Sequence, residues 1–200
     1  MREKILDKAG EMFLNLGFKS VTMDDIASEI GVSKKTIYTH FKNKTDLVKE
    51  VTNYMFDNIC CGIDLIHEQE KNPIIELFEI KRFVINHLKN EKSSPQYQLQ
   101  KYYPKIFSDI KKKQFDFMQN SIKENLQRGL DQQLFRDTID VEFISRIYFY
   151  GMTAIKDNEL FPTQMFSQNE LLDKYLEYHL RGICTNKGIE VIEKQLKEIK

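Results

Sequence analysis

The sequence predicts an all-α protein of about nine or ten helices. Three observations lead to this expectation. Apolar residues recur at three- and four-residue intervals along most of the chain, as they do on one face of an α-helix. Only four prolines and eight glycines interrupt the 200 residues, which favours long helices over a turn-rich β architecture. The composition, 41% hydrophobic and 30% charged, is that of a globular chain with a core of its own.

Residues 2–16 form the first expected helix, with Ile5 and Phe13 on its apolar face. Gly17 follows at the position where a residue in the left-handed conformation commonly ends a helix. Thr22 begins the run TMDD, in which a hydroxyl precedes an acid by three residues, as in a capping box. A short second helix therefore begins after Thr22 and ends at Gly31.

The segment GVSKKTIYTHFKNK, residues 31–44, predicts a tight turn and a basic helix. Gly31 permits the turn and Ser33 can cap a third helix over about 34–41. If Ile37 and Phe41 are buried, the opposite face is rich in donors and has no acid. That face and its edge carry Lys34, Lys35, Thr36, Thr39, His40, Lys42 and Lys44.

Two short helices joined by a glycine-containing turn and packed on a first helix form a helix-turn-helix unit. An acid-free helix face of this kind suits the phosphate-lined major groove of DNA. A solvated, lysine-rich surface on an ordinary three-helix packing is the alternative, and composition alone does not separate the two. The order of cap, short helix, turn, basic helix and long helix favours DNA binding.

A long helix follows over about 45–68, and EKNP at 70–73 interrupts the chain. An amphipathic stretch then extends to about Lys89, and the polar run at 90–96 predicts a surface loop. The remaining expected elements are a short helix near 97–102, a long helix over 104–128, an irregular link that Gly129 opens, and helices over 140–157 and 168–182.

The helices expected at 140–157 and 168–182 carry apolar residues on more than one face. Such a helix needs partners on two sides. One partner can be the core of its own domain and the other a second copy of the chain. A thick core within one chain is the alternative.

The run TMDDIASEIGVSKKTIYTHFKNKTDLV, residues 22–48, closely resembles the DNA-binding segment of TetR-type transcriptional regulators. The upstream ILDKAGEMFLNLGF, residues 5–18, is similar to the first helix of that family and the glycine that ends it. The resemblance covers about the first 60 residues. One departure is Lys35, because many members of the family have a small residue directly before the equivalent of Thr36.

The resemblance implies an N-terminal three-helix helix-turn-helix domain over 1–60, joined by a long helix to a larger helical domain over 61–200 that binds an effector and dimerises. It implies a sequence-specific DNA-binding regulator, a repressor that a small-molecule effector releases from its operator. The partners are double-stranded DNA with a roughly palindromic site and a second copy bound through 140–157 and 168–182. Lys34, Lys35 and Thr36 would lie closest to base edges. The phosphate side and the caps would comprise Thr22, Ser33, Tyr38, His40 and Lys44.

A ligand pocket is expected among the helices of the larger domain, where the family holds its effectors. Aromatic and methionine side chains are abundant there, although residues of this kind at helical spacing also build ordinary cores. The candidates are Tyr102, Tyr103, Phe107, Phe115, Met118, Tyr148 and Met152.

An α-helical enzyme or metal-binding protein is the alternative function. Its ligands would come from His67, Glu68, Glu70, His87 and His179, but these residues do not form a His-x-x-x-His or Glu-x-x-His pair. No glycine-rich phosphate loop or nucleophile elbow is present. We therefore expect no catalytic residues, no metal and no cofactor, and the three cysteines (Cys60, Cys61 and Cys184) predict neither a disulfide framework nor a zinc site.

Lysine plus arginine and aspartate plus glutamate are equal at 30 each. A surface for nucleic acid must therefore be local, and the zero net charge argues against a protein that binds nucleic acid without sequence preference. No apolar run approaches the roughly 20 residues that span a bilayer. The first residues, MREKILDKAGEMF, carry acids among the bases, unlike a signal peptide. We expect a cytoplasmic bacterial protein that does not bind membranes.

Overall fold

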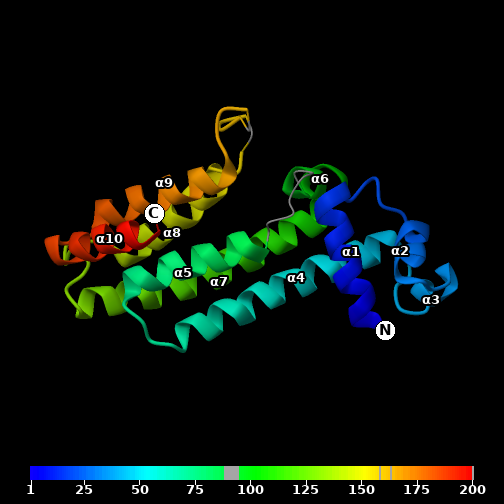
Figure 1. Ribbon diagram of the computed structural model, residues 1–200, viewed down its shortest axis with the longest axis horizontal. Coiled ribbons are helices and arrows are strands. Elements are labelled where there is room, and N and C mark those ends of the chain that lie inside the picture. The colour runs from blue at the N-terminus through cyan, green and yellow to red at the C-terminus, as the bar shows by residue number, and fades with distance from the viewer. Residues whose placement is uncertain (88–94, 158, 163, 200) are drawn as a thin grey trace. The chain divides into compact units, whose positions relative to one another are not determined.

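The computed structural model describes residues 1–87, 95–157, 159–162 and 164–199. Ten helices follow one another through these residues (Figure 1), which confirms the all-α expectation. Within the described residues, the β structure amounts to one isolated bridge between Phe135 and Cys184. The helices are α1 (Arg2–Leu16), α2 (Met23–Ile30), α3 (Lys34–Tyr38), α4 (Lys44–His67), α5 (Pro73–His87), α6 (Pro95–Tyr102), α7 (Pro104–Asp131), α8 (Val141–Ala154), α9 (Gln168–Ile183) and α10 (Asn186–Ile199).

The chain forms two compact units, and neither is a single stretch of sequence. The first comprises Met1–Gly62 and Asn86–Gln114, and the second comprises Ile63–Ile85 and Phe115–Lys200. Helices α4, α5 and α7 therefore each contribute residues to both units. The functional division near residue 60 stays a prediction, because compactness does not say which residues bind an effector.

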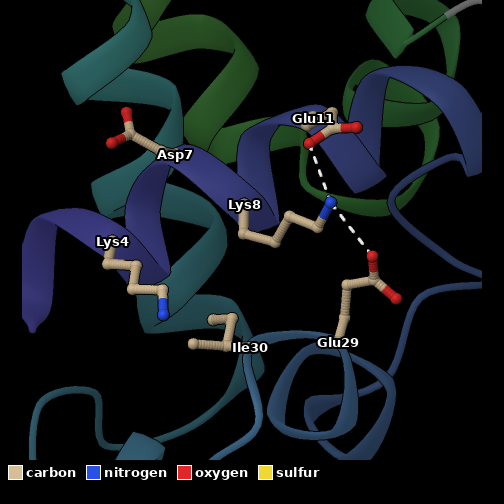
Figure 2. Close-up of a pocket in the computed structure, with 6 residues that line it drawn as sticks. All are labelled: Lys4, Asp7, Lys8, Glu11, Glu29 and Ile30. Carbon is tan, nitrogen blue, oxygen red and sulfur yellow. Dashed lines mark hydrogen bonds and ion pairs between the residues drawn. The ribbon is translucent and has the colours of Figure 1, made fainter.

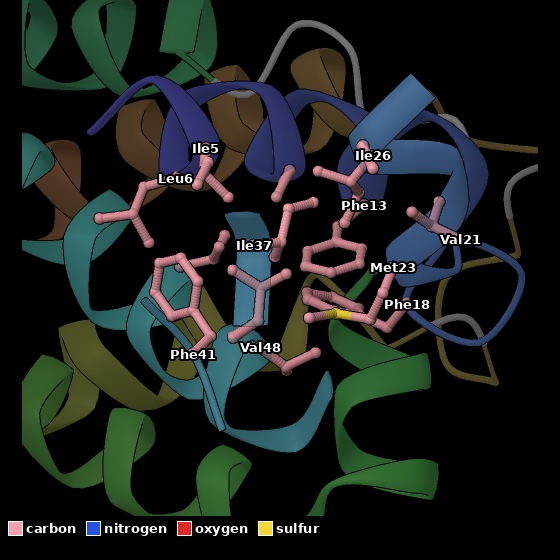
Figure 3. Close-up of a cluster of buried hydrophobic side chains, with 14 of the residues drawn as sticks. Ile5, Leu6, Phe13, Phe18, Val21, Met23, Ile26, Ile37, Phe41 and Val48 are labelled. Carbon is pink, nitrogen blue, oxygen red and sulfur yellow. The ribbon is translucent and has the colours of Figure 1, made fainter. Parts of the chain in front are cut away.

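The core of the first unit is made by α1, α2, α3 and the start of α4. Figure 3 shows Phe13, Ile37 and Phe41 among the aliphatic side chains of these helices, and all three are essentially inaccessible to solvent. Phe13 stacks on Phe18, with ring centroids 5.0 Å apart. Leu99 of α6 is buried in the same cluster. Hydrophobic burial from four helices thus holds the short α3, which is too short to be stable alone.

The core of the second unit lies between α5, α7, α8, α9 and α10. Helices α8 and α9 cross closely at Gly151, where the Tyr175 hydroxyl donates to the backbone carbonyls of Ile147 and Tyr148 at 3.1 and 3.2 Å. A Cβ atom at Gly151 would lie 2.1 Å from that hydroxyl oxygen. Glycine at this position therefore permits the contact. No helix among the described residues has both the length and the apolar character needed to cross a membrane.

Several helix ends differ from the sequence-based expectation. Helix α3 ends at Tyr38, although Phe41 N–H still bonds the Ile37 carbonyl at 3.0 Å, so the last expected turn is loosened rather than lost. Gly17 has a positive φ of 87°, but its ψ of 152° is not that of a left-handed helical residue. Helix α7 continues through Gly129 to Asp131, where an irregular link was expected.

The loop expected at 90–96 falls largely outside the described residues. Its last two residues, Pro95 and Gln96, belong instead to α6, because proline is well tolerated in the first turn of a helix. The predicted extension of the preceding helix to Lys89 also lies outside the described residues. Helix α10 is absent from the helices predicted above, although Ile189, Ile192 and Leu196 are spaced as on one helical face.

Candidate DNA-binding surface

The capping box at Thr22 fixes where α2 begins. The Thr22 hydroxyl accepts a hydrogen bond from the Asp25 backbone N–H at 3.1 Å, and the Asp25 carboxylate accepts one from the Thr22 backbone N–H at 2.8 Å. Because the backbone and then the hydroxyl of Thr22 donate to it, the pKa of Asp25 lies below its ordinary value. Thr22 is exposed at the surface.

Gly31 and Ser33 shape the turn between α2 and α3. Gly31 adopts the left-handed conformation, with φ 76° and ψ 36°. A Cβ atom there would meet nothing within 4 Å, so the backbone conformation rather than lack of space requires glycine. The Ser33 hydroxyl accepts from the Thr36 backbone N–H at 3.1 Å and lies 2.9 Å from the Thr36 hydroxyl. Ser33 is therefore the N-cap of α3.

Two buried side chains determine which face of α3 is exposed. Ile37 and Phe41 have exposed fractions of 0% and 1%. The face opposite Ile37 is therefore the solvent face, and Tyr38 beside it is 45% exposed. Thr36 is half-buried, while Lys34, Lys35, Thr39 and His40 are exposed.

The lysines of this surface differ in how their charge is compensated. The Lys34 ammonium lies 2.6 Å from the Asp24 carboxylate, and this contact raises the pKa of Lys34. The Lys35 and Lys42 ammonium groups have neither a hydrogen-bond nor an ion-pair partner among the described residues. Lys35 is therefore an uncompensated positive charge on the exposed face of α3.

Lys44 is the first residue of α4 and is half-buried. Its ammonium group donates to the backbone carbonyl of Lys19 at 3.0 Å. Burial lowers the pKa of Lys44, and the nearby Asp25 carboxylate opposes this shift. The start of α4 is capped in turn, because the Asn43 side chain accepts from the Asp46 N–H at 2.9 Å.

The structure brings the eight predicted DNA contacts together in three adjacent segments of the first unit. These segments are the start of α2, the turn with α3 and the residues after it, and the start of α4. Their contacts with DNA stay a prediction. The sequence did not reveal that Lys19 and Gln98 support this surface, because Gln98 lies 79 residues from its partner along the chain.

The seven residues predicted to line an effector pocket are divided between the two units. Within the first unit, Tyr103 packs edge-to-face on Phe18, with ring centroids 6.4 Å apart. Within the second, Tyr148 is buried and burial raises the pKa of its hydroxyl. The ligand role of these residues stays a prediction. The first unit holds Tyr102, Tyr103 and Phe107, and the second holds Phe115, Met118, Tyr148 and Met152.

A surface hollow of about 380 Å³ lies beside α1 and α2, and none of those seven residues lines it. Figure 2 shows the Lys8 ammonium between two carboxylates in this hollow, at 3.0 Å from both Glu11 and Glu29. These contacts raise the pKa of Lys8. The two carboxylates therefore compensate the charge of Lys8. The hollow is lined by Lys4, Asp7, Lys8, Glu11, Glu29 and Ile30.

The histidines considered as metal ligands have other surroundings. His67 lies 3.0 Å from the Glu76 carboxylate and 2.7 Å from the Ser121 hydroxyl. His179 is buried against the rings of Tyr148 and Tyr175, and burial lowers the pKa of His179 to about 4. In the part of the chain that the structure describes, no three histidine, cysteine or acidic side chains are grouped closely enough to hold a metal ion.

Helices α8 and α9 expose large apolar side chains in addition to those that they bury. Phe143, Ile147 and Tyr150 of α8 are 59%, 45% and 65% exposed, and Tyr178 of α9 is 78% exposed. The three residues on α8 follow at intervals of four and three, so they form one stripe along the helix. We call these four residues the apolar α8–α9 face.

Comparisons with known proteins agree with this arrangement. The sequence model described as "Bacterial regulatory proteins, tetR family" matches residues 5–51. The chain is 27% identical over 194 residues to the HTH-type transcriptional repressor KstR2 of Mycolicibacterium smegmatis, covering 94% of this chain and 92% of that protein. It is 37% identical over 62 residues to the HTH-type transcriptional activator FasR of the same organism, covering 31% of this chain and 28% of that protein.

The fold is likewise shared with a solved structure. The TetR-family transcriptional regulator from Agrobacterium tumefaciens superposes with a TM-score of 0.73 at 16% identity, covering 92% of this chain and 97% of that one. The family model matches the helix-turn-helix, and KstR2 is similar over nearly the whole chain. The shared fold agrees with both findings. Together these comparisons support a transcriptional regulator of the TetR family, whose sequence model matches residues 5–51.

Proposed function

We propose that this protein is a sequence-specific DNA-binding repressor that a small-molecule effector releases from its operator. The observation that carries the proposal is the exposed face of α3, which Ile37 and Phe41 orient by their burial in the core. This face presents donors and an uncompensated lysine on the second short helix of a helix-turn-helix. That is the element that enters the major groove in proteins of this kind.

The proposed contacts divide into two groups. Lys34, Lys35 and Thr36 approach base edges, where lysine and hydroxyl donors can distinguish base pairs. Tyr38, His40 and Lys44 approach phosphates, while Thr22 and Ser33 cap the two short helices. Phosphate contacts fix the register of the protein on DNA and carry little sequence information.

A homodimer built on the apolar α8–α9 face completes the proposal. One short helix reads only a few base pairs, which do not select one site in a genome. Two copies related by a twofold axis double the contact and require a roughly palindromic operator. Four large apolar side chains exposed on neighbouring helices support a contact with a second copy.

Repression rather than activation is supported by the relative KstR2, a repressor that matches nearly the whole chain, whereas the activator FasR matches about a third of it. An effector releases the operator only if it binds more tightly to a dimer geometry that does not fit DNA. Coupling of this kind typically amounts to about 1–3 kcal/mol. An enzyme is disfavoured, because the family consists of regulators. A cytoplasmic location stays a prediction.

Selection of bound sequences from random duplex DNA tests the proposal directly. We expect the full-length protein to enrich one palindromic motif, whose half-sites are separated by about one helical turn. The variant Lys35→Ala should enrich an altered motif. Absence of any enriched motif from the wild-type protein would contradict the proposal. Repeating the selection with candidate ligands would then identify a compound that releases the DNA.

A further inference from the structure

Helix α6 belongs to the same compact unit as the helix-turn-helix. Its Leu99 is 5% exposed and lies in the core that also contains Phe13 and Ile37. Tyr103, directly after the helix, packs against Phe18 in the loop between α1 and α2. The α1–α2 loop is thus supported by a helix that lies about 80 residues further along the chain.

Gln98 of α6 contacts this loop directly. A Cβ atom at Gly17 would lie 2.3 Å from the Gln98 amide nitrogen, and Gly17 has a positive φ of 87°. Glycine is therefore needed both for the backbone conformation and for the approach of Gln98. The Gln98 side-chain oxygen accepts a hydrogen bond from the Lys19 backbone N–H at 3.3 Å. Tyr102 adds a second contact, since the Lys19 ammonium lies 5.0 Å from its ring centroid.

The other side of Lys19 holds a residue of the DNA-binding surface. The Lys19 backbone carbonyl accepts the hydrogen bond from the Lys44 ammonium at 3.0 Å. A chain of two hydrogen bonds therefore links α6 to Lys44, from Gln98 through the backbone of Lys19. An ammonium group has three protons, so Lys44 can keep this bond and still donate to a phosphate.

We propose that Gln98 is a positioning residue for DNA binding. It holds the α1–α2 loop so that the Lys19 carbonyl orients Lys44 toward the phosphate backbone. The inference rests on the proposed function, because it assigns a support to one of the proposed phosphate contacts. It also gives α6 a role at the DNA, since a displacement of α6 that breaks the Gln98–Lys19 hydrogen bond would remove this support from Lys44.

The test measures the affinity for a duplex carrying the selected operator at several salt concentrations. The variants are Gln98→Leu, which keeps the volume and removes the acceptor, Lys44→Ala, and the combination of both. Gln100→Ala is the matched control, because Gln100 lies on the same helix and is exposed. Circular dichroism and thermal unfolding of each variant establish that it is folded.

Losing one phosphate contact lowers the slope of log affinity against log salt by about 0.9. We expect Lys44→Ala to show this loss and Gln98→Leu to show part of it, with affinity reduced roughly three- to tenfold. The double variant should bind like Lys44→Ala alone, because residues that act through one contact are not additive. Gln100→Ala should match the wild type.

Additive effects of Gln98→Leu and Lys44→Ala, or an unchanged slope in Gln98→Leu, would overturn the inference while leaving the proposed function intact. A wild-type protein that does not bind the duplex would overturn both. If Gln98→Leu does not fold, Gln98→Asn replaces it. The shorter amide keeps the polarity but cannot reach Lys19, so the same change in slope is expected.

Discussion

The two adjacent lysines at the start of α3 have different surroundings. The Lys34 ammonium lies 2.6 Å from the Asp24 carboxylate, whereas the Lys35 ammonium has no partner among the described residues. Lys35 is also the position where the sequence departs from the small residue common in the family. An unpaired cation on the exposed face of α3 can contact a base edge without first losing an ion pair.

Lys35→Ala should therefore change the preference between operator variants by about 1–3 kcal/mol, the usual contribution of a good base contact. Lys44→Ala should instead weaken binding to all sequences alike. Competition between the selected operator and its single-base variants measures both effects. If Lys35→Ala weakened binding to every duplex by the same factor, Lys35 would belong with the phosphate contacts.

Glu76 is a fully buried carboxylate in the second unit. It accepts hydrogen bonds from Asn125 at 2.8 Å and from the Arg128 guanidinium, and His67 lies 3.0 Å away. Burial acts to raise the pKa of Glu76, but the hydrogen bonds from His67, Asn125 and Arg128 outweigh it and hold this pKa below its ordinary value. His67 is the last residue of α4 and Arg128 belongs to α7, so the group joins three helices.

Arg128→Met should destabilise the second unit by about 2–3 kcal/mol, because it leaves a buried carboxylate short of donors. The value is below the usual range for buried pairs, since the Arg128 side chain is 31% exposed. Urea unfolding measures the loss. The control Lys174→Met removes an exposed ion pair with Glu170 and should change stability by less than about 0.5 kcal/mol.

The pH dependence follows from the lowered pKa of Glu76. A carboxyl whose folded pKa is lowered contributes stability above its unfolded pKa, and this contribution is lost as pH falls through the folded value. In Arg128→Met the pKa of Glu76 rises and the gap to its unfolded value narrows, so the variant, although less stable at neutral pH, should lose less stability than the wild type as the pH falls. Equal acid sensitivity of Arg128→Met and Lys174→Met would argue against this role.

At the scale of helices, most helix ends that have a capping residue could be predicted from the local sequence. Thr22 and Ser33 begin α2 and α3, and Gly31 ends α2, as expected, because each acts on backbone within a few residues of its own position. Helix α7 was harder to delimit. Gly129 lies inside the helix, and a Cβ atom there would lie 2.1 Å from the Phe135 ring, so the glycine makes room for Phe135 instead of ending the helix. Sequence spacing does not reveal this contact.

In the candidate site, too, the features set by nearby residues could be predicted, whereas the contacts between distant residues could not. The exposed face of α3 follows from the spacing of Ile37 and Phe41, so its residues could be named from the sequence. The support from Gln98 joins residues 79 positions apart and has no periodicity to indicate it. Similarly, the pairing of Lys34 with Asp24 depends on how α2 and α3 cross, which the turn alone does not specify.

The crossing of α8 and α9 gives a prediction at this scale. Gly151→Ala should destabilise the second unit by about 1–3 kcal/mol, because the added methyl group displaces the Tyr175 hydroxyl from the backbone carbonyls it bonds. Gly182→Ala is the control. A Cβ atom at Gly182 would meet nothing within 4 Å, so alanine should be neutral or stabilise α9 by up to about 1 kcal/mol. Thermal unfolding of both variants measures the difference, and equal melting temperatures would contradict the close crossing.

At the scale of the whole molecule, the proposed function depends on two copies acting together. Four large apolar residues (Phe143, Ile147, Tyr150 and Tyr178) are each at least 45% exposed. The sequence alone would direct a test to Tyr148 and Leu176, which lie on the same two helices. Those two side chains are 5% and 1% exposed. Charging them would unfold the second unit and say nothing about assembly.

Ile147→Asp combined with Tyr178→Asp should instead split the dimer and leave the fold intact. Both positions are exposed in the single chain, so the new carboxylates stay hydrated there, whereas a dimer contact would bury them without partners. The variant should lose binding to the palindromic operator although α3 is unchanged, because one half-site gives too little contact. Sedimentation velocity measures the assembly and circular dichroism the fold. A wild-type protein that is monomeric at micromolar concentration yet binds one half-site tightly would contradict the dimer, as would a variant that sediments as the wild type does.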